Sequence, residues 1–382
     1  MTARLPRVTV IGAGLVGSSI ALAVREAEAG RVVLVDADPG VRQRAAALGI
    51  AEQVLSSVPD AVEDADIVIA AVPAGAVPEV LSAAAAAAPS TAILTDAASL
   101  KLTSTLEVTS RLRDAGAGPE RFVGGHPMAG SERSGPEAAD AQLFQGATWV
   151  LTPTSATSDA TLTELSAFLR RLGARVVALP PEQHDELVAV VSHLPQVVAS
   201  SLAAVAADAI EATGDAVLAV AGGGFRDTTR IAASDPGLWV PILSGNRVAV
   251  LEALDAYTGR LEQVRAAVAE ARWQDLHALL ARASAARQRL VPKATPAAVG
   301  DVVVPMDDRP GQLAAATTAL GAAGINVEDL AMRHAGDGGR GALLVRVAAG
   351  DLARAVEVLA AAGLGAHVEH DAAGPGPEGV AP

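Results

Sequence analysis

Short apolar runs of strand length alternate with helical segments through the first half of the chain. In order, the runs are RVTVIG, VVLVDA, DIVIAAVP, AILTDAAS, FVGGHP, TWVLTP and RVVALP. Segments with helical patterning, such as SSIALAVREAEAG, separate the early runs. Repeated alternation of strand and helix is typical of a parallel, doubly wound sheet. We therefore expect an α/β domain of the Rossmann type over residues 1–180.

Two later changes of pattern divide the remainder of the chain. From Glu182 to about Leu290, long Ala-, Val- and Leu-rich helical stretches are apolar over much of their circumference. Such helices need burial against one another or against a second subunit, so we expect an all-helical substrate and dimerisation domain over residues 181–291 of a homodimer. Residues 299–370 follow the order βαββαβ, the ferredoxin-like arrangement. Residues 371–382 have the composition of a disordered tail.

Charge and composition exclude several classes of function. The 382-residue chain has a net charge of −14 and no cysteine. The negative charge argues against a nucleic acid or an anionic membrane as partner, and the lack of cysteine excludes disulfides and thiolate chemistry. The N-terminus runs straight into a strand, and no uninterrupted apolar run reaches the ~18 residues of a membrane span. We expect a soluble cytoplasmic protein that acts on a small molecule.

A glycine-rich turn lies between the first predicted strand and the first predicted helix. The turn is GAGLVG at residues 12–17. In the GxGxxG pattern the first glycine permits a tight turn, the second lets a pyrophosphate approach the backbone, and the third allows helix and strand to pack closely. Asp36 ends the second strand, where a carboxylate accepts hydrogen bonds from the adenosine ribose and repels a 2′-phosphate. We expect NAD rather than NADP, with an empty or different nucleotide site as the alternative. The predicted cofactor-binding residues are Gly12, Gly14, Leu15, Val16, Gly17, Asp36, Val72 and Pro73.

His126 lies in GGHPMAGSERSG, a stretch that suits neither a good helix nor a good strand. A nicotinamide enzyme needs a group that takes the hydroxyl proton as hydride leaves, and histidine serves because its free pKa is about 6.5. The stretch follows a predicted strand, and loops at the carboxyl ends of such strands form the ligand crevice. We predict an active-site loop with His126 as the base; a surface loop with an incidental histidine is the alternative.

The segment HDELVAVVSHLPQ contains two of the other histidines. His184 and His193 are nine residues apart, half a helical turn off a common face. No pair of histidines has the HExxH spacing of zinc proteases. We therefore predict no metal site.

The segment GGGFRDTTRIAASDPGLW predicts a glycine-hinged turn that enters a helix. Arg226 and Arg230 are i, i+4 partners and would share one face of that helix. Arginine holds a carboxylate in a bidentate manner, so we expect an anionic substrate. The alternative is that each arginine forms a salt bridge, with Asp227 or Asp235 as the partner.

Taken in order, these motifs resemble a known family. GLVGSS, TDAASLK, GGHPMAGSERSG, HDELVAVVSHLP and GFRDTTRIAASDP look like prephenate dehydrogenases or their arogenate-using relatives, over roughly Val8 to Leu290. Beyond them, DRPGQLA and GINVEDL resemble an ACT domain.

The resemblance implies an NAD-dependent oxidative decarboxylation of prephenate to 4-hydroxyphenylpyruvate in tyrosine biosynthesis. His126 would accept the hydroxyl proton and must be neutral to do so. Ser99 would bond both His126 and the substrate hydroxyl, and Arg230 would hold a substrate carboxylate. Arg226 and Asp227 would reach across a dimer interface. The implied substrate-binding residues are Arg230, Ser131, Glu132, His193, Gln196, Arg226 and Asp227.

Gln196 stands where prephenate-using members often have a second histidine. Its amide offers both a donor and an acceptor, which suits the keto group of prephenate or the ammonium of arogenate. Arogenate dehydrogenase, which would give tyrosine directly, therefore remains open.

The ACT resemblance implies an amino-acid effector, with tyrosine expected before phenylalanine. The turn after the first strand of this segment would bind the α-carboxylate, and Asn326 would meet the α-amino group. The alternative is a dimerisation strap without a ligand. The predicted effector-binding residues are Arg309, Pro310, Gly311, Gln312, Leu313 and Asn326.

Two other functions compete with this interpretation. One is a Rossmann dehydrogenase acting on a 3-hydroxy acid, in which Lys101 could serve as the acid–base group. The other is a non-catalytic, amino-acid-sensing regulator that keeps the nucleotide fold.

Overall fold

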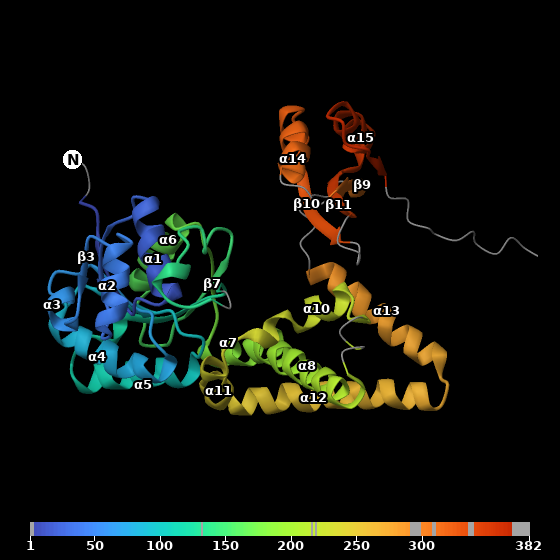
Figure 1. Ribbon diagram of the computed structural model, residues 1–382. Coiled ribbons are helices and arrows are strands. Elements are labelled where there is room, and N and C mark those ends of the chain that lie inside the picture. The colour runs from blue at the N-terminus through green and yellow to red at the C-terminus, as the bar shows by residue number, and fades with distance from the viewer. Residues whose placement is uncertain are drawn as a thin grey trace, which may run out of the picture. The chain divides into compact units, whose positions relative to one another are not determined.

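The structure is a computed structural model, and the chain forms two compact units, Met1–Arg265 and Ala266–Pro382 (Figure 1). The residues that it describes are 4–130, 133–214, 217, 220–290, 299–307, 311–334 and 340–368.

An eight-stranded sheet organises the N-terminal part of the first unit, in the order β3-β2-β1-β4-β5-β6-β7-β8. Every run predicted as a strand is confirmed. The short edge strand β3 was not predicted, because three residues leave no readable alternation. The strands are β1 (Arg7–Ile11), β2 (Arg31–Val35), β3 (Gln53–Leu55), β4 (Ile67–Ala70), β5 (Ile93–Asp96), β6 (Phe122–Pro127), β7 (Thr148–Thr152) and β8 (Arg175–Ala178).

The expected parallel sheet is confirmed from β3 to β6, but β7 pairs antiparallel with β6. A parallel pair needs a long crossover, usually a helix. The described residues between these two strands contain only the short 3-10 turn η3 (Pro136–Ala138), so the chain returns in the opposite direction. This pairing places His126 opposite Val150.

Helices cover both faces of the sheet (Figure 1). One apolar cluster includes side chains of α1, α2 and α6, and the other includes side chains of α3, α4 and α5. Parallel strands buried on both faces explain the continuous apolar runs in the sequence. The helical elements of this part are α1 (Leu15–Glu26), α2 (Pro39–Ala47), α3 (Val58–Val62), η1 (Ala74–Ala76), α4 (Val77–Ala87), α5 (Leu102–Asp114), η2 (Pro119–Arg121) and α6 (Asp159–Arg171).

The strand pattern ends where the sequence predicts, and helices follow. The expected continuous helix from residue 182 is interrupted by one π-helical turn, η4. Pro195 follows this turn. Proline has no N–H to donate to the carbonyl four residues earlier, and its ring clashes with that carbonyl, so the regular helix is interrupted before it. The elements are α7 (Pro181–Val188), η4 (Ala189–His193), α8 (Leu194–Thr213), α10 (Gly223–Thr229), η5 (Arg230–Ala233), α11 (Pro236–Gly245), α12 (Arg247–Ala269) and α13 (Trp273–Leu290).

The helical run Pro181–Thr213 has an apolar surface that the chain itself leaves largely uncovered. By length and composition alone the run could span a membrane, since its most apolar 18-residue window has a mean hydropathy of 1.6. Only 28% of that window is buried within the structure. The run also carries His184, Asp185 and His193, which make buried polar contacts. Ionisable groups are costly in lipid, so this surface suits a protein partner better than a membrane.

The second unit contains the expected βαββαβ arrangement, which is thereby confirmed. Its strands form an antiparallel sheet in the order β10-β11-β9-β12. An apolar core joins the sheet to its two helices. The elements are β9 (Val299–Asp307), α14 (Gln312–Ala322), β10 (Val327–His334), β11 (Arg340–Ala348), η6 (Ala349–Asp351), α15 (Leu352–Ala361) and β12 (His367–Val368).

Candidate active site

The glycine loop follows β1 and opens α1, and each of its glycines has a separate physical reason. Gly12 has φ +105°, and a Cβ there would lie 2.3 Å from the carbonyl oxygen of Ala71. A Cβ on Gly17 would lie 1.8 Å from the carbonyl oxygen of Gly12. A Cβ on Gly14 would meet nothing within 4 Å. The first and third glycines are therefore required by the fold, whereas the second faces space through which a phosphate can approach the backbone.

Asp36 lies directly after β2 and holds the glycine loop in place. Its Oδ2 accepts a hydrogen bond of 2.8 Å from the amide of Ala13, and its Oδ1 accepts one of 2.8 Å from the amide of Asp38. A carboxylate offers about four acceptor positions, so capacity remains for ribose hydroxyls. The glycine loop and this half-buried carboxylate fit the adenosine half of NAD.

The other predicted cofactor residues lie at the same edge of the sheet. Leu15 and Val16 begin α1. Val72 and Pro73 follow β4, which pairs in parallel with β1. Because the carboxyl ends of parallel strands meet at one edge, both loops border the same crevice.

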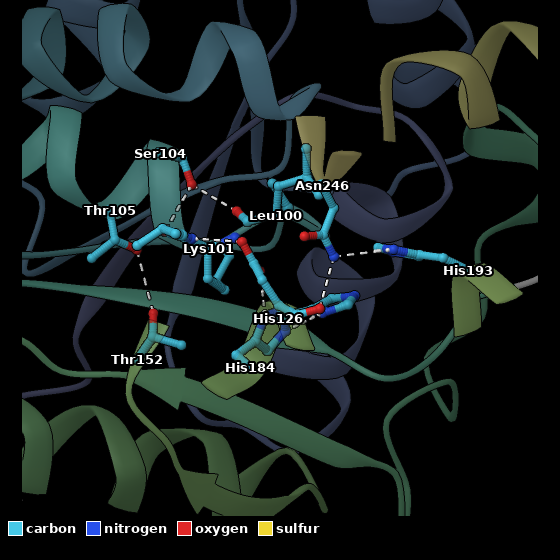
Figure 2. Close-up of polar contacts among 12 residues, drawn as sticks. Leu100, Lys101, Ser104, Thr105, His126, Thr152, His184, His193 and Asn246 are labelled. Carbon is cyan, nitrogen blue, oxygen red and sulfur yellow. Dashed lines mark hydrogen bonds and ion pairs between the residues drawn. The ribbon is translucent and has the colours of Figure 1, made fainter. Parts of the chain in front are cut away.

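His126 lies at the carboxyl end of β6, inside the strand rather than in the loop after it. Its ring is buried, with 9% of the residue exposed. His126 Nδ1 lies 2.8 Å from His184 Nε2, and His184 Nδ1 lies 2.7 Å from Asp185 Oδ1 (Figure 2). His184 and Asp185 come from α7, so the strand and the helix meet through this chain of polar contacts.

Asp185 also fixes the start of α5. Its Oδ1 accepts from the amide of Lys101 at 2.9 Å, and its Oδ2 accepts from the amide of Leu102 at 2.9 Å. Burial acts to raise the pKa of Asp185, but the hydrogen bonds from His184 and from these two amides bring it below the ordinary value. The side chain is therefore an ionised acceptor at neutral pH.

Lys101 is fully buried and ties three elements together. Its Nζ forms an ion pair with Asp96 at the end of β5 and donates to the carbonyl oxygen of Gly125 in β6 at 2.7 Å. Asp96 in turn accepts from the amide of Gly125 at 3.1 Å. A Cβ on Gly124 or Gly125 would lie within 2.6 Å of neighbouring oxygen atoms, so the glycines before His126 allow this close packing.

The environment of His126 favours its neutral form. Burial is the largest effect that lowers its pKa well below the usual value, followed by nearby His184, Lys101 and His193. The ring therefore has a free lone pair at neutral pH, as a general base requires.

Ser99 does not form the predicted hydrogen bond to His126. It is half-buried in the loop after β5. Within the described part of the chain, Ser99 makes no hydrogen bond to the ring, and His184 bonds Nδ1 instead. The expected Ser99–His126 contact is thus not present in this structure.

His193 and Gln196 lie one turn apart and are both buried. Asn246 Nδ2 donates to the carbonyl oxygen of Asp185 at 2.7 Å and lies 3.2 Å from His193 Nδ1 (Figure 2). The ring of Trp239 packs edge-on against His193 with centroids 6.2 Å apart.

Two buried polar atoms near His193 have no hydrogen-bond partner among the described residues. They are Gln196 Oε1 and Trp239 Nε1. Gln196 Nε2 is engaged, since it donates to Ser200 Oγ at 3.3 Å. Buried polar groups are normally paired, so an acceptor and a donor left open here indicate a site for a polar ligand.

The predicted arginines lie on the helical part of the chain. Arg226 and Asp227 are on α10 and Arg230 begins η5, and all three residues are exposed. Arg230 directly follows the last residue of α10, Thr229, and has helical φ and ψ angles. Asp235, considered as a salt-bridge partner, instead caps α11 by accepting from the amide of Gly237 at 2.9 Å. Ser131 and Glu132 lie outside the described residues.

The predicted effector residues are only partly described. Gly311, with φ +92°, precedes the first residue of α14. Gln312 and Leu313 form its first turn, and Leu313 is exposed. Asn326 is exposed just before β10. Arg309 and Pro310 lie outside the described residues.

Several residues of this site were not predicted as functional. His184 and Asp185 were noted only as part of a motif, and Lys101 only as a rival base. A histidine followed directly by an aspartate was the available signal for the first pair. Asn246, between α11 and α12, carried no local signal at all.

These features define a class of protein: a nicotinamide-dependent dehydrogenase with a Rossmann sheet, a helical second domain and a buried neutral histidine at the nucleotide edge. Matches to protein-family sequence models identify the family within this class. The prephenate dehydrogenase nucleotide-binding domain matches residues 20–178, the prephenate dehydrogenase dimerization domain matches residues 180–282, and the ACT domain matches residues 302–363. The chain belongs to the prephenate dehydrogenase family and is an NAD-dependent oxidoreductase of that family.

Individual relatives agree with this assignment. Cyclohexadienyl dehydrogenase of Zymomonas mobilis is 34% identical over 69% of this chain and 88% of its own length. Prephenate dehydrogenase of Bacillus subtilis is 32% identical over 85% of this chain and 87% of its own. The crystal structure of Aquifex aeolicus prephenate dehydrogenase with hydroxyphenyl propionate and NAD+ has a TM-score of 0.68 at 28% identity, covering 76% of this chain and all (100%) of that one.

Proposed function

We propose that this enzyme catalyses the NAD-dependent oxidative decarboxylation of prephenate to 4-hydroxyphenylpyruvate. The observation that carries the proposal is His126, buried and kept neutral at the carboxyl end of β6. Its strand is two positions from β4, whose terminal loop borders the glycine loop. The two relatives named prephenate dehydrogenase support the choice of substrate.

His126 takes the proton of the substrate's ring hydroxyl. The glycine loop and Asp36 would hold NAD+, which would accept the hydride from the carbinol carbon of the substrate. The substrate's ring carboxylate leaves as CO2, its bonding electrons enter the ring that becomes aromatic, and the former carbinol oxygen regains a proton as the phenol hydroxyl. The buried setting of His126 excludes water from the transferred proton.

The residues proposed to hold the substrate come from the helical part and from the loop after β6. His193 and Gln196 line the polar site beside Trp239. Arg230 holds a substrate carboxylate, and Ser131 and Glu132 contribute from the loop.

We further propose a homodimer in which Arg226 and Asp227 act on the partner's site. Both are exposed on α10, within the region that matches a dimerization domain. Arg226 forms no ion pair in the described part of the chain, so its charge is available to an anion.

Arogenate is the second candidate substrate. Gln196 Oε1 is a buried acceptor without a partner, while the amide nitrogen is engaged with Ser200. An open acceptor suits the ammonium of arogenate better than the keto group of prephenate. The relative named cyclohexadienyl dehydrogenase is compatible with either ring substrate.

Initial rates of NADH formation with prephenate and with arogenate, together with measured CO2, test the proposal. Equal molar release of NADH and CO2 from prephenate supports it, and the same result from arogenate alone would support the second candidate. NADH without CO2 from a 3-hydroxy acid would favour the rival dehydrogenase. The burial of Lys101 counts against that rival, because its acid–base group would have no access to substrate. NAD binding without turnover of either substrate would favour the regulator.

His126→Asn tests the assignment of the base. We expect turnover to fall at least about 100-fold, since a positioned base contributes 10²–10⁴-fold, while the Kd for NAD stays within about twofold. Retention of more than about a tenth of the rate, a loss of under 1.4 kcal/mol of barrier, would remove His126 from this role.

The ACT domain is proposed to bind tyrosine at the turn from β9 into α14 and to inhibit the enzyme. Gly311 adopts a left-handed conformation there that favours glycine. Rates measured with increasing tyrosine and phenylalanine test this. If neither amino acid changes the rate at millimolar concentration, the alternative of a dimerisation strap without a ligand is favoured. A cytoplasmic location, the domain limits 1–180, 181–291 and 299–370, and the tail 371–382 also remain proposals.

A further inference from the structure

The contacts of Asp185 determine which atom of the next residue carries a proton. Its carboxylate accepts from the amides of Lys101 and Leu102. An ionised carboxylate has no hydrogen to donate. The 2.7 Å contact with His184 Nδ1 therefore requires the hydrogen to be on His184.

The same reasoning passes along the chain to His126. In a neutral imidazole, a protonated Nδ1 leaves Nε2 as an acceptor. When His184 is neutral its Nε2 accepts, and the 2.8 Å contact then requires a hydrogen on Nδ1 of His126. The lone pair of His126 is then on Nε2, the only ring nitrogen not engaged by His184.

We propose that His184 and Asp185 are positioning residues that hold His126 in the Nδ1–H tautomer, so that Nε2 is the base, and that they support the positive charge when His126 takes a proton. The inference rests on the proposed function for the identity of the proton donor. It adds the atom that reacts and the two residues that select it.

The surrounding structure keeps this relay in one arrangement. His184 and Asp185 are 1% and 5% exposed. Asn246 donates to the backbone carbonyl of Asp185, and the start of α5 holds its carboxylate. Neither side chain can therefore turn without leaving buried polar groups unpaired.

The charges around His126 come from several elements. Charge on His184 in α7, on Lys101 at the start of α5 or on His193 in η4 disfavours a proton on the ring. Asp96 in β5 is paired with Lys101 and reduces the effect of its charge. Asp185 in α7 reaches His126 only through His184. The relay is thus the route by which an anion can stabilise protonated His126.

The tautomer can be observed directly by ¹⁵N NMR of the imidazole rings in the full-length protein labelled at histidine, without substrate. The His126→Asn variant identifies the signals of that ring. We expect a protonated Nδ1 and an unprotonated Nε2 at neutral pH. A His126 ring protonated on Nε2 would overturn the proposal, whatever the enzyme's activity.

Kinetics of two substitutions separate selection of the tautomer from support of the charge. His184→Gln keeps an acceptor for His126 Nδ1 but cannot itself be protonated, whereas His184→Phe removes the acceptor. We expect kcat to fall about 10-fold in the first and about 100-fold in the second, with KM for both substrates within about threefold. The second loss is at the lower end of the roughly 10²–10⁴-fold contribution of general acid–base catalysis, and the first is below it because an acceptor remains. The acid limb of the kcat profile should move to lower pH in His184→Phe, because protonated His126 loses its acceptor.

His277→Phe is the matched control, because His277 is exposed on α13. It should change neither kcat nor the pH profile. If His184→Phe does not fold, the kinetics of His184→Gln and the NMR measurement still test the proposal. A His184→Gln enzyme with unchanged kcat and an unchanged pH profile would reduce His184 to a packing role. If the wild-type enzyme oxidises neither prephenate nor arogenate, the proposed function fails while the tautomer remains measurable.

Discussion

His126 and His193 expose 9% and 1% of their surfaces, and burial is the largest effect that lowers the pKa of each ring. In the unfolded chain both rings titrate near a pKa of about 6.5. Between that value and the lowered native values, the unfolded state binds more protons than the native state. The free energy of unfolding should therefore decrease as pH falls below about 6.5 and stop decreasing once the native rings are also protonated.

Urea unfolding at fixed protein concentration between pH 7.5 and pH 5 measures this dependence. His277→Asn, which changes an exposed histidine, should leave the slope against pH unchanged. A free energy of unfolding that stays constant from pH 7 to pH 5.5 would contradict the burial of neutral rings.

Asp36 is the residue on which the choice of nucleotide depends. Arg42 Nη1 donates to the backbone carbonyl oxygens of Asp36 and Ala37, at 2.8 Å each, so a guanidinium is held at the backbone of this turn. In Asp36→Ser the repulsion of a 2′-phosphate is removed while this positive charge remains. We expect the ratio of kcat/KM for NADP to that for NAD to rise at least about 10-fold, equivalent to 1.4 kcal/mol.

The double variant Asp36→Ser with Arg42→Ala is the control. It should lose most of the gain with NADP if the guanidinium supplies the attraction. An unchanged cofactor ratio in Asp36→Ser would show that neither side chain selects the nucleotide.

At the scale of elements, Lys101 joins the start of α5 to β5 and β6. Its removal in Lys101→Met leaves the buried carboxylate of Asp96 without its cation. Breaking one side of a buried pair typically costs about 3–5 kcal/mol of folding free energy, so we expect a loss of that order in chemical unfolding.

Pairing Lys101→Met with Asp96→Asn tests the cause of that loss. The double variant removes the uncompensated charge and should recover part of the stability, although Asp96 also accepts from the amides of Ala98 and Gly125. A single variant as stable as the wild type would mean that Asp96 finds another partner or takes up a proton.

At the scale of the whole molecule, an active site shared between subunits predicts complementation. His126→Asn and Arg226→Ala should each be nearly inactive as homodimers. In mixed dimers one site receives both defects and the other receives neither. Equal amounts, unfolded together and refolded, should therefore recover about a quarter of wild-type activity, because half of the dimers are mixed and each has one intact site.

Two controls accompany the mixing experiment. A mixture of His126→Asn with His184→Phe should recover nothing, since both residues act in the same subunit's site. Absence of recovery with Arg226→Ala would place this arginine in its own subunit's site or outside any site.

Local pattern alone determined much of this protein. Apolar runs predicted all strands except β3, because a strand buried on both faces requires consecutive apolar residues. The glycine loop and Asp36 could be read directly, because a tight turn, a close helix–strand contact and a ribose acceptor each demand a residue type at a fixed spacing. The βαββαβ order of the second unit followed from periodicity in the same way.

Only the tertiary structure decided what His126 contacts. Its partner His184 lies 58 positions away in the sequence, and Asn246 meets Asp185 across 61 positions. The reversal of β7 and the absence of a Ser99–His126 bond likewise depend on how distant segments pack. Sequence spacing specifies neighbours along one element, whereas hydrogen-bond partners between elements are selected by burial, where each polar group must find the nearest complementary atom.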